Sequence, residues 1–382
     1  MQFLADLPLR LNGGRWPTSH VQGVAVDLDR GHVYYSFTTL LVKTALDGTL
    51  LGTVGGLSGH LGDITFDPVA RRLYGSLEYK AAAAFYVAIF DVDAIDREGL
   101  LAVDASVVRT VHLAEVVADY TWSSAVAAQP SLASGSADSR RSSSAEGAYR
   151  GLSTLADTSP LRHRYGCSGI DGIAFGPRFG STDGPLLLTV AYGVFSDLAR
   201  DDNDHQVLLQ YATDDWWEHL ARPLNELDPH RSGPSHPDGK YFVRTGNTRF
   251  GVQNLEFDAH AERWFLGVYA GEKPDFPNFT LFAVDAAALP TLGPLAGLGG
   301  ELGLTLALAD DGLWDENTGV RGWYQHADVG IAAVGEGLFY LSESSVREGL
   351  QTSDVTLHRW SGDARMPFAP VVATKSAPLT TA

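Results

Sequence analysis

The stretch "GDITFDPVARRLYGSL" (Gly62–Leu77) describes two short alternating strands joined by a turn. The same pattern returns four times, in "QGVAVDLDRGHVYYSF" (22–37), "DGIAFGPRFGSTDGPLLLTVAYG" (171–193), "QNLEFDAHAERWFLGVYAG" (253–271) and "GIAAVGEGLFYLSES" (330–344). Four-stranded units repeated around a ring are how a β-propeller removes its long sheet edges. The sequence therefore predicts an all-β chain with a β-propeller fold, and a β-sandwich is the alternative.

The repeats and the intervals between them fit six or seven blades. We expect residues 1–382 to form a single propeller domain. The Ser/Ala-rich segment at about 123–160 has few large apolar residues and predicts an insertion loop within that domain. One short surface helix is expected in "TDDWWEHLARPLNEL" (213–227), which has an acidic start and an apolar stripe.

The composition limits the partners that the protein can have. A formal net charge of −18 argues against nucleic acid, which needs clustered Lys and Arg. The single cysteine, Cys167, allows neither an intrachain disulfide nor a multi-cysteine zinc site. No apolar run is long enough for a membrane span, and Asp6 and Arg10 make the N-terminus a poor signal peptide. We expect a cytoplasmic protein without a membrane partner, or a secreted one if an export signal precedes this sequence.

Polar residues recur just before or at the start of the predicted inner strands, where a propeller needs only small residues. Because inner strands start near the central channel, these side chains are expected to meet at one mouth. The set consists of His20, Gln22, His60, Asp63, Ser168, Asp171, Gln253 and Asn254. In the alternative interpretation, the Asp and Asn side chains only bond neighbouring backbone groups.

Three further groups of charged, polar or aromatic residues are candidates for the functional site. Arg164 and Arg162 flank His163, which suggests an anion clamp, although surface solvation explains them equally well. Glu256 replaces the Ala or Thr of the other repeats, so it needs a partner such as a metal ion or an Arg. Two more groups precede the last two repeats: Asn247 and Arg249 before the fourth, and Arg321, Trp323, Tyr324 and His326 before the fifth. The aromatic residues of the second group are suited either to stacking on a sugar ring or to packing between blades.

Motifs of other chemistries are missing or incomplete. "ARDDNDHQ" (199–206) is acidic but lacks the EF-hand positions, so a turn followed by a strand is the better interpretation. The sequence contains no Walker motif, no Gly-x-Ser-x-Gly elbow and no His-Glu-x-x-His. A serine triad or a zinc hydrolase site is therefore unsupported.

Several motifs together resemble the β-propeller polysaccharide lyases that act on rhamnosyl-glucuronate ends. They are "HVQGVAVD", "YYSFTTLLVKT", "GHLGDITFD", "LYGSLEYK", "HRYGCSGIDGIAF", "NDHQVLLQY", "KYFVRTGNTRFGVQNLEFD" and "GVRGWYQHADVG", which span nearly the whole chain outside the Ser/Ala-rich segment. The resemblance implies an L-rhamnose-α-1,4-D-glucuronate lyase, an exo-acting enzyme on gum arabic-type arabinogalactan side chains. It also implies seven blades and the possibility of a bound Ca²⁺, with no organic cofactor.

Such a lyase removes the C5 proton of the uronate and expels the group on O4. The reaction needs a cation or amide on the carboxylate, a base and an acid. On this resemblance His60 would be the principal acid or base, with Tyr79 or His20 as its partner. Arg164 and Arg321 would hold the carboxylate, Trp323 would stack on the rhamnose, and Glu256 would be the candidate metal ligand.

The other residues expected to bind substrate are Gln22, Asp63, Glu78, His163, Asp171, Asn247, Gln253, Asn254 and Tyr324. Two alternatives remain open. One is a propeller hydrolase, either a calcium-dependent lactonase or a glycosidase, for which Asp63, Glu78, Asp171 and Glu256 are available. The other is a non-catalytic propeller that binds carbohydrate.

Overall fold

The computed structural model describes residues 7–127, 165–246 and 248–372. The expected insertion loop at about 123–160 lies largely outside them, and so do His163, Arg164 and Asn247. Within the described residues the fold is all-β, as predicted, and nearly all strand pairs are antiparallel. No helix in these ranges is long and apolar enough to cross a membrane.

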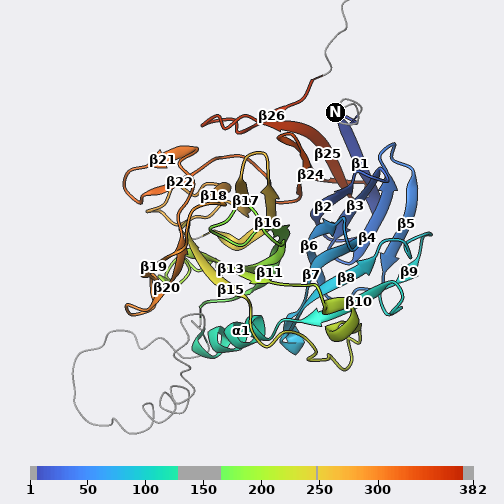
Figure 1. Cartoon of the computed structure of the whole chain (residues 1–382), viewed down its shortest axis with the longest axis horizontal. Coiled ribbons are helices and arrows are strands. Elements are labelled where there is room, and N and C mark those ends of the chain that lie inside the picture. The colour runs from blue at the N-terminus through green and yellow to red at the C-terminus, as the bar shows by residue number, and fades with distance from the viewer. Residues whose placement is uncertain (1–6, 128–164, 247, 373–382) are drawn as a thin grey trace, which may run out of the picture.

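Five sheets stand around one axis, and their inner strands β2, β6, β11, β16 and β23 follow one another in chain order (Figure 1). The first contains β2 (Val21–Asp27), β3 (His32–Phe37), β4 (Leu40–Ala45), β5 (Leu50–Gly55) and β9 (Leu100–Leu101). The second contains β6 (His60–Asp67), β7 (Arg72–Tyr79), β8 (Ala84–Asp91), β10 (Val108–His112) and β14 (Arg222–Pro223).

The third sheet is the widest. It contains β11 (Gly169–Gly176), β12 (Leu187–Gly193), β13 (His205–Tyr211), β15 (Gly239–Arg244), β20 (Leu302–Leu306) and β19 (Thr291–Pro294). The fourth contains β16 (Arg249–Asp258), β17 (Arg263–Tyr269) and β18 (Leu281–Asp285), and the ribbon of β21 (Leu313–Asp315) and β22 (Val320–Gly322) continues beside β18.

The fifth sheet joins the two ends of the described chain. It contains β23 (Ile331–Gly335), β24 (Leu338–Arg347), β25 (Leu350–Trp360), β26 (Phe368–Pro370) and the N-terminal strand β1 (Arg10–Trp16). Pairing of β1 with β25 closes the ring, because a strand from the start of the chain completes the last sheet.

The inner strands contact one another in the cyclic order β2, β6, β11, β16, β23 and back to β2. The described residues therefore form a propeller of five blades, and the prediction of seven or six is wrong for them. The strands between the repeats, such as β5, β9 and β10, do not form extra blades. They extend the outer edges of the same five sheets.

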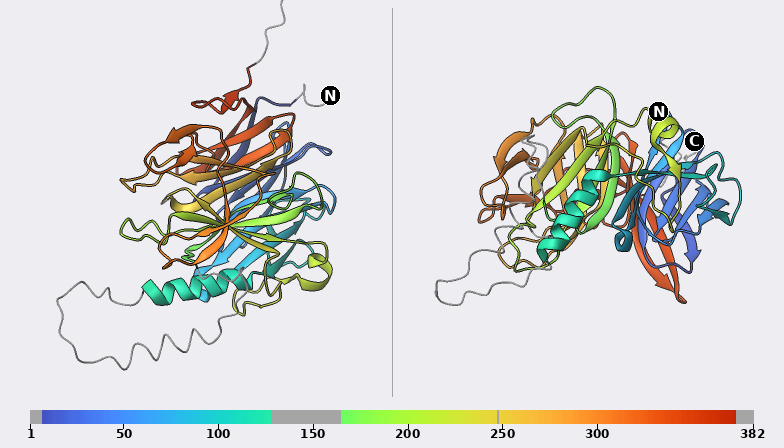
Figure 2. Two further views of the ribbon diagram at one scale, coloured as in Figure 1. Left: turned by 60° about the vertical axis from the view of Figure 1, so that its left-hand side comes forward. Right: turned by 90° about the horizontal axis from the view of Figure 1, so that it is seen from below.

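Helical structure differs from the prediction. The expected surface helix at 213–227 is reduced to one π-helical turn, η3 (Trp216–Leu220), whose Trp216 is buried in the core. A further 3-10 turn, η2 (Lys80–Ala82), links β7 to β8. The longest helix, α1 (Ala114–Ala127), was not predicted; it packs along the outside of the ring against β8 and β11 (Figure 2).

A buried ion cluster fixes α1 to the third sheet. Glu115 and Asp119 lie four residues apart, so their side chains share one face of the helix. Lys240 of β15 is fully buried and contacts both carboxylates, at 2.9 Å and 2.5 Å. The Tyr192 hydroxyl also donates to Asp119, at 2.8 Å. Because this lysine is paired on both sides, its burial is compatible with a stable fold.

Candidate functional site

The inner strands carry bulges that turn polar side chains toward the axis. The pairing register shifts between Val21 and Gly23 in β2, between Leu61 and Ile64 in β6, and between Ile170 and Ile173 in β11. In β16 it shifts between Val252 and Asn254. A bulge leaves one residue outside the ladder and re-aims its side chain. The polar residues of the repeats, among them Gln22, Asp63, Asp171 and Gln253, occupy these irregular positions.

Asp63 joins three inner strands at the axis. Its carboxylate accepts hydrogen bonds from the backbone N–H groups of Ile64, Ile173 and Leu255, at 2.9, 3.1 and 2.9 Å. It also accepts one from the Asn254 amide, at 2.6 Å. Burial raises the pKa of Asp63 to about 8 in spite of these donors. This residue supports the site from behind and does not face the cavity.

A cavity of about 610 Å³ opens above these bulges. Its lining comes from the first four blades and includes acids, bases, amides and aromatic side chains: His20, Gln22, His60, Glu78, Lys80, Ser168, Asp171, Arg249, Phe250, Gln253 and Tyr269, together with small or apolar residues. The expectation that polar residues of different repeats meet at one mouth therefore agrees with the described structure.

His60 lies in a row of interacting side chains along one wall. The Gln22 amide is 2.9 Å from His60 Nε2, and Glu78 Oε1 is 3.7 Å from His60 Nδ1. Lys80 Nζ is 3.0 Å from the same Glu78 oxygen. Burial, with Lys80 and His20, lowers the pKa of His60 to about 4. The imidazole is therefore neutral at neutral pH and can accept a proton.

Glu78 is held by the next blade. The backbone N–H of Ile170 donates to Glu78 Oε2 at 3.1 Å. The approach requires glycine at position 169, because a Cβ there would lie 2.2 Å from that oxygen. Burial raises the pKa of Glu78, while Lys80 and the Ile170 N–H oppose the shift.

Asp171 is a second buried carboxyl in the same cavity. Its Oδ1 has no hydrogen-bond partner among the described residues. This oxygen lies so close to Gly62 that a Cβ at position 62 would be 2.2 Å from it. Burial raises the pKa of Asp171 well above its usual value, and the charges of Glu78 and Asp63 raise it further. Since Glu78 has a lysine beside it, the pair favours a charged Glu78 and a protonated Asp171.

The structure separates the predicted site residues into three groups. Eight line the cavity: His20, Gln22, His60, Glu78, Ser168, Asp171, Arg249 and Gln253. Asp63 and Asn254 lie behind it, where Asn254 also donates to the Gln22 carbonyl at 2.7 Å. Tyr79, Arg321, Trp323 and Tyr324 are not in its lining.

Tyr79 does not partner His60. Successive side chains of a strand point to opposite faces, so Tyr79 and its neighbour Glu78 cannot both face the cavity. The Tyr79 hydroxyl donates instead to Glu226 at 2.9 Å, and burial and this glutamate raise the pKa of the tyrosine.

The segment after β21 belongs to the outer part of the fourth blade. Arg321 stacks on Trp314 and lies 3.7 Å from Asp310. Trp323 is fully buried and donates to the Asp363 carbonyl at 3.0 Å, so it packs the blade and does not offer a sugar platform. Tyr324 is exposed and packs edge-on against Phe279. The roles predicted for these residues are therefore wrong for the cavity described here.

Glu256 has no metal site around it in the described part of the chain. One of its oxygens accepts the Ala333 N–H at 2.8 Å, and burial raises its pKa well above the usual range. No group of three or more His, Cys, Asp or Glu side chains is gathered for a metal in these residues. Since Ca²⁺ takes six to eight oxygen ligands, this setting does not fit it.

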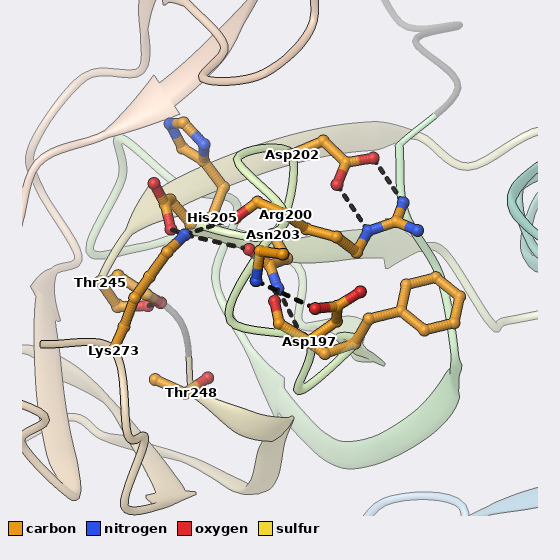
Figure 3. A network of polar contacts seen from close by, with 12 residues as sticks. Asp197, Arg200, Asp202, Asn203, His205, Thr245, Thr248 and Lys273 are labelled. Atoms are coloured by element: carbon orange, nitrogen blue, oxygen red, sulfur yellow. Dashed lines mark hydrogen bonds and ion pairs between the residues drawn. The ribbon is translucent and has the colours of Figure 1, made fainter. Parts of the chain in front are cut away.

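In the acidic loop at 197–204, the ammonium group of Lys273 contacts the oxygen atoms of the loop (Figure 3). Lys273 Nζ contacts the Arg200 carbonyl at 2.7 Å, Asn203 Oδ1 at 3.3 Å and Asp204 Oδ1 at 2.5 Å. Arg200 forms two bonds to Asp202, at 2.7 and 2.6 Å. Asp202 and Asp204 are thus paired with cations of the same chain, and β13 follows the loop, as the turn-and-strand interpretation expected.

Three side chains that line the cavity were not among the residues predicted from the sequence: Lys80, Phe250 and Tyr269. Lys80 could have been included, because its charge lies two residues from the Glu78 carboxyl in the sequence, although it begins η2 and is not part of the strand. Phe250 carried no signal, since its exposure results from a bulge that only the strand pairing reveals.

The fold and this cavity define a β-propeller with acid, base and cationic side chains at its axis. No family model matches the chain, and no curated protein matches it. Solved structures that are similar include hydrazine synthase from Kuenenia stuttgartiensis, with 9% identity and a TM-score of 0.36 over 89% of this chain and 72% of the other.

Two further similar structures are an exo-β-1,3-galactanase from Phanerochaete chrysosporium and the Dos1 propeller. The galactanase has 10% identity and a TM-score of 0.41, over 95% of this chain and 66% of the other. The Dos1 propeller has 9% identity and a TM-score of 0.31, over 92% and 81%. Similarities this distant carry no argument about activity, so the function has to be argued from the cavity.

Proposed function

We propose that the cavity is the active site of a carbohydrate-active enzyme that cleaves a uronate-containing glycan by β-elimination. The observation that carries the proposal is the row of Gln22, His60, Glu78 and Lys80, which presents a neutral imidazole beside a lysine. A base and a cation side by side are what removal of a proton next to a carboxylate requires. In a chain of net charge −18, cations lining a cavity also favour an anionic substrate.

In this reaction His60 takes the proton from C5 of the uronate. With the Gln22 amide donating to Nε2, the ring proton of His60 is on Nδ1, toward Glu78. Glu78 then stabilises the imidazolium that forms, as the acidic partner of a catalytic histidine does. The Nε2 lone pair becomes available to the substrate when the substrate displaces the Gln22 amide.

The remaining steps use Lys80, Arg249 and Asp171. The two cations bind the uronate carboxylate and make the C5 proton more acidic. The C5–H and C4–O4 bonds break, a C4=C5 double bond forms, and protonated Asp171 gives its proton to the leaving oxygen. Lys80 and Arg249 thus take the role that the resemblance gave to Arg164 and Arg321, and Asp171 takes the role of partner to His60, which the resemblance gave to Tyr79 or His20.

The substrate we propose is a rhamnosyl-α-1,4-glucuronate end, as in gum arabic-type arabinogalactan side chains. We expect incubation with such a glycan to release rhamnose and to raise ultraviolet absorbance at the same rate, because the unsaturated uronate absorbs. Rhamnose without absorbance would contradict elimination. Absence of both would contradict this substrate.

A propeller hydrolase is the second candidate. The observation that favours it is the pair of Glu78 and Asp171, two carboxyls in one cavity whose surroundings separate their pKa values. Glycosidases use such a pair as base or nucleophile and as acid. This candidate predicts rhamnose release without absorbance, so the same incubation distinguishes the two.

The dependence of kcat/KM on pH should report the protonation of His60. Because its pKa is lowered to about 4, kcat/KM is expected to fall only as the pH drops through about 4, where the base becomes protonated. On the alkaline side, activity should fall as Asp171 loses its proton.

Replacing Lys80 by Met removes a charge that lowers the pKa of His60, so the acidic limb of the kcat/KM profile should move to higher pH. Lys80→Arg keeps the charge and should leave this limb in place. An acid limb that does not move in Lys80→Met would contradict His60 as the base.

A further inference from the structure

Phe250 is an aromatic side chain at the edge of the cavity that is not buried in the core. It is 50% exposed and lines the cavity beside Arg249 and Tyr269. Its ring lies 6.3 Å from that of Tyr269, at 86°, and the Arg249 guanidinium lies 5.7 Å from its centre. Phe250 thus presents a half-open aromatic face next to a cation.

The backbone at Phe250 is strained. Its φ is +62°, a left-handed conformation that is unfavourable for a bulky residue. Glycine or asparagine would adopt this conformation more easily. Phe250 is aromatic, half exposed, in a strained conformation and part of the cavity lining. This combination indicates that the ring itself contacts a ligand.

The surrounding chain holds Phe250 in place. The register shift between Arg249 and Val252 forms the bulge that carries it. Gly251 must be glycine, because its φ is +82° and a Cβ there would lie 2.5 Å from the Tyr192 carbonyl. The Gly251 N–H donates to the Thr248 carbonyl at 3.2 Å, and the Gln253 amide donates to the Phe250 carbonyl at 3.2 Å.

The residue just before this bulge, Thr248, is tied to the third blade. Gln206 of β13 donates to the hydroxyls of Thr245 and Thr248, at 2.8 and 2.5 Å, and Thr248 is the residue just before β16. A platform fixed in this way loses little conformational freedom when a ligand binds, which favours affinity.

We infer that Phe250 is a specificity-determining residue that binds the apolar face of the sugar ring next to the uronate, while Arg249 contacts the carboxylate. This inference rests on the proposed function and adds to it the side chains that select an acidic disaccharide unit. The Arg249 side chain is half exposed, and its pairing with Glu272 at 3.6 Å is between exposed groups. Such a pair is weak, so a substrate carboxylate can replace it.

The test uses Phe250→Gly and a matched control. Glycine accepts the left-handed backbone, so this variant should be no less stable than the wild type to denaturant, although glycine also frees the unfolded chain. Its KM on the rhamnosyl-α-1,4-glucuronate glycan should rise roughly tenfold or more, with kcat changed much less. Phe250→Tyr, which keeps the ring, should keep the wild-type KM.

Glu262→Gly is the control, since Glu262 is exposed at the turn between β16 and β17 and also has a left-handed φ, of +52°. It should match Phe250→Gly in stability but leave KM unchanged. Equal KM values for Phe250→Gly and the wild type would overturn the inference while leaving the proposed function in place. A clear loss of stability in Phe250→Gly alone would also overturn it, because the ring would then be structural. If the wild type neither binds nor cleaves the glycan, the proposed function fails and the inference fails with it.

Discussion

Replacing His60 by alanine is expected to lower turnover of a glucuronate glycan by about 10³-fold, the usual effect of removing a general base. The fold should remain, because the His60 side chain is 29% exposed and makes one close hydrogen bond, to Gln22. Loss of that bond costs about 1 kcal/mol. The measurement is kcat on the glycan together with the urea midpoint of both proteins.

Two controls make this result specific. His219 is exposed on η3, outside the cavity lining, so His219→Ala should keep full activity. Added imidazole should restore part of the activity of His60→Ala, since it can enter the space left beside Gln22 and Glu78. Wild-type turnover in His60→Ala would remove His60 from the mechanism.

Replacing Asp63 by asparagine is expected to destabilise the whole propeller by several kcal/mol. Asp63 accepts backbone hydrogen bonds from β6, β11 and β16 and an amide hydrogen bond from Asn254. An asparagine keeps one acceptor oxygen and turns an NH₂ group toward the other donors. Each buried donor left without an acceptor costs about 1–3 kcal/mol. Urea denaturation measures the loss.

Asp67→Asn is the matched control on the same strand. Asp67 accepts from the backbone N–H groups of Val69 and Ala70, in the turn that follows β6. Because those donors are near solvent and in the same hairpin, we expect a loss of about 1 kcal/mol or less. Equal losses for the two variants would contradict the view that Asp63 joins the three blades.

The propeller was predictable because each repeat carries the signal of its own inner hairpin. The blade number was not, since the intervening strands can extend an existing blade as well as form a new one. In the structure β10 and β14 extend the second sheet, and β15, β20 and β19 extend the third. Helix α1 was missed because its buried partner, Lys240, lies more than a hundred residues away in the sequence.

The site was predicted best where a residue belongs to a repeat. Gln22, His60 and Asp171 could be placed together because their strands start at the same end of the ring. Trp323 was misplaced because nearness to a repeat in sequence does not fix the face that a side chain takes. Tyr79 could have been excluded from strand alternation alone, once Glu78 was assigned to the cavity.

The most direct test of the account is the mass of the uronate product from a rhamnosyl-glucuronate glycan deuterated at C5. Elimination by His60 predicts a uronate that has lost the deuterium and is lighter than glucuronate by the elements of water. A saturated uronate that keeps its deuterium would contradict the account and would assign the cavity to hydrolysis by Glu78 and Asp171.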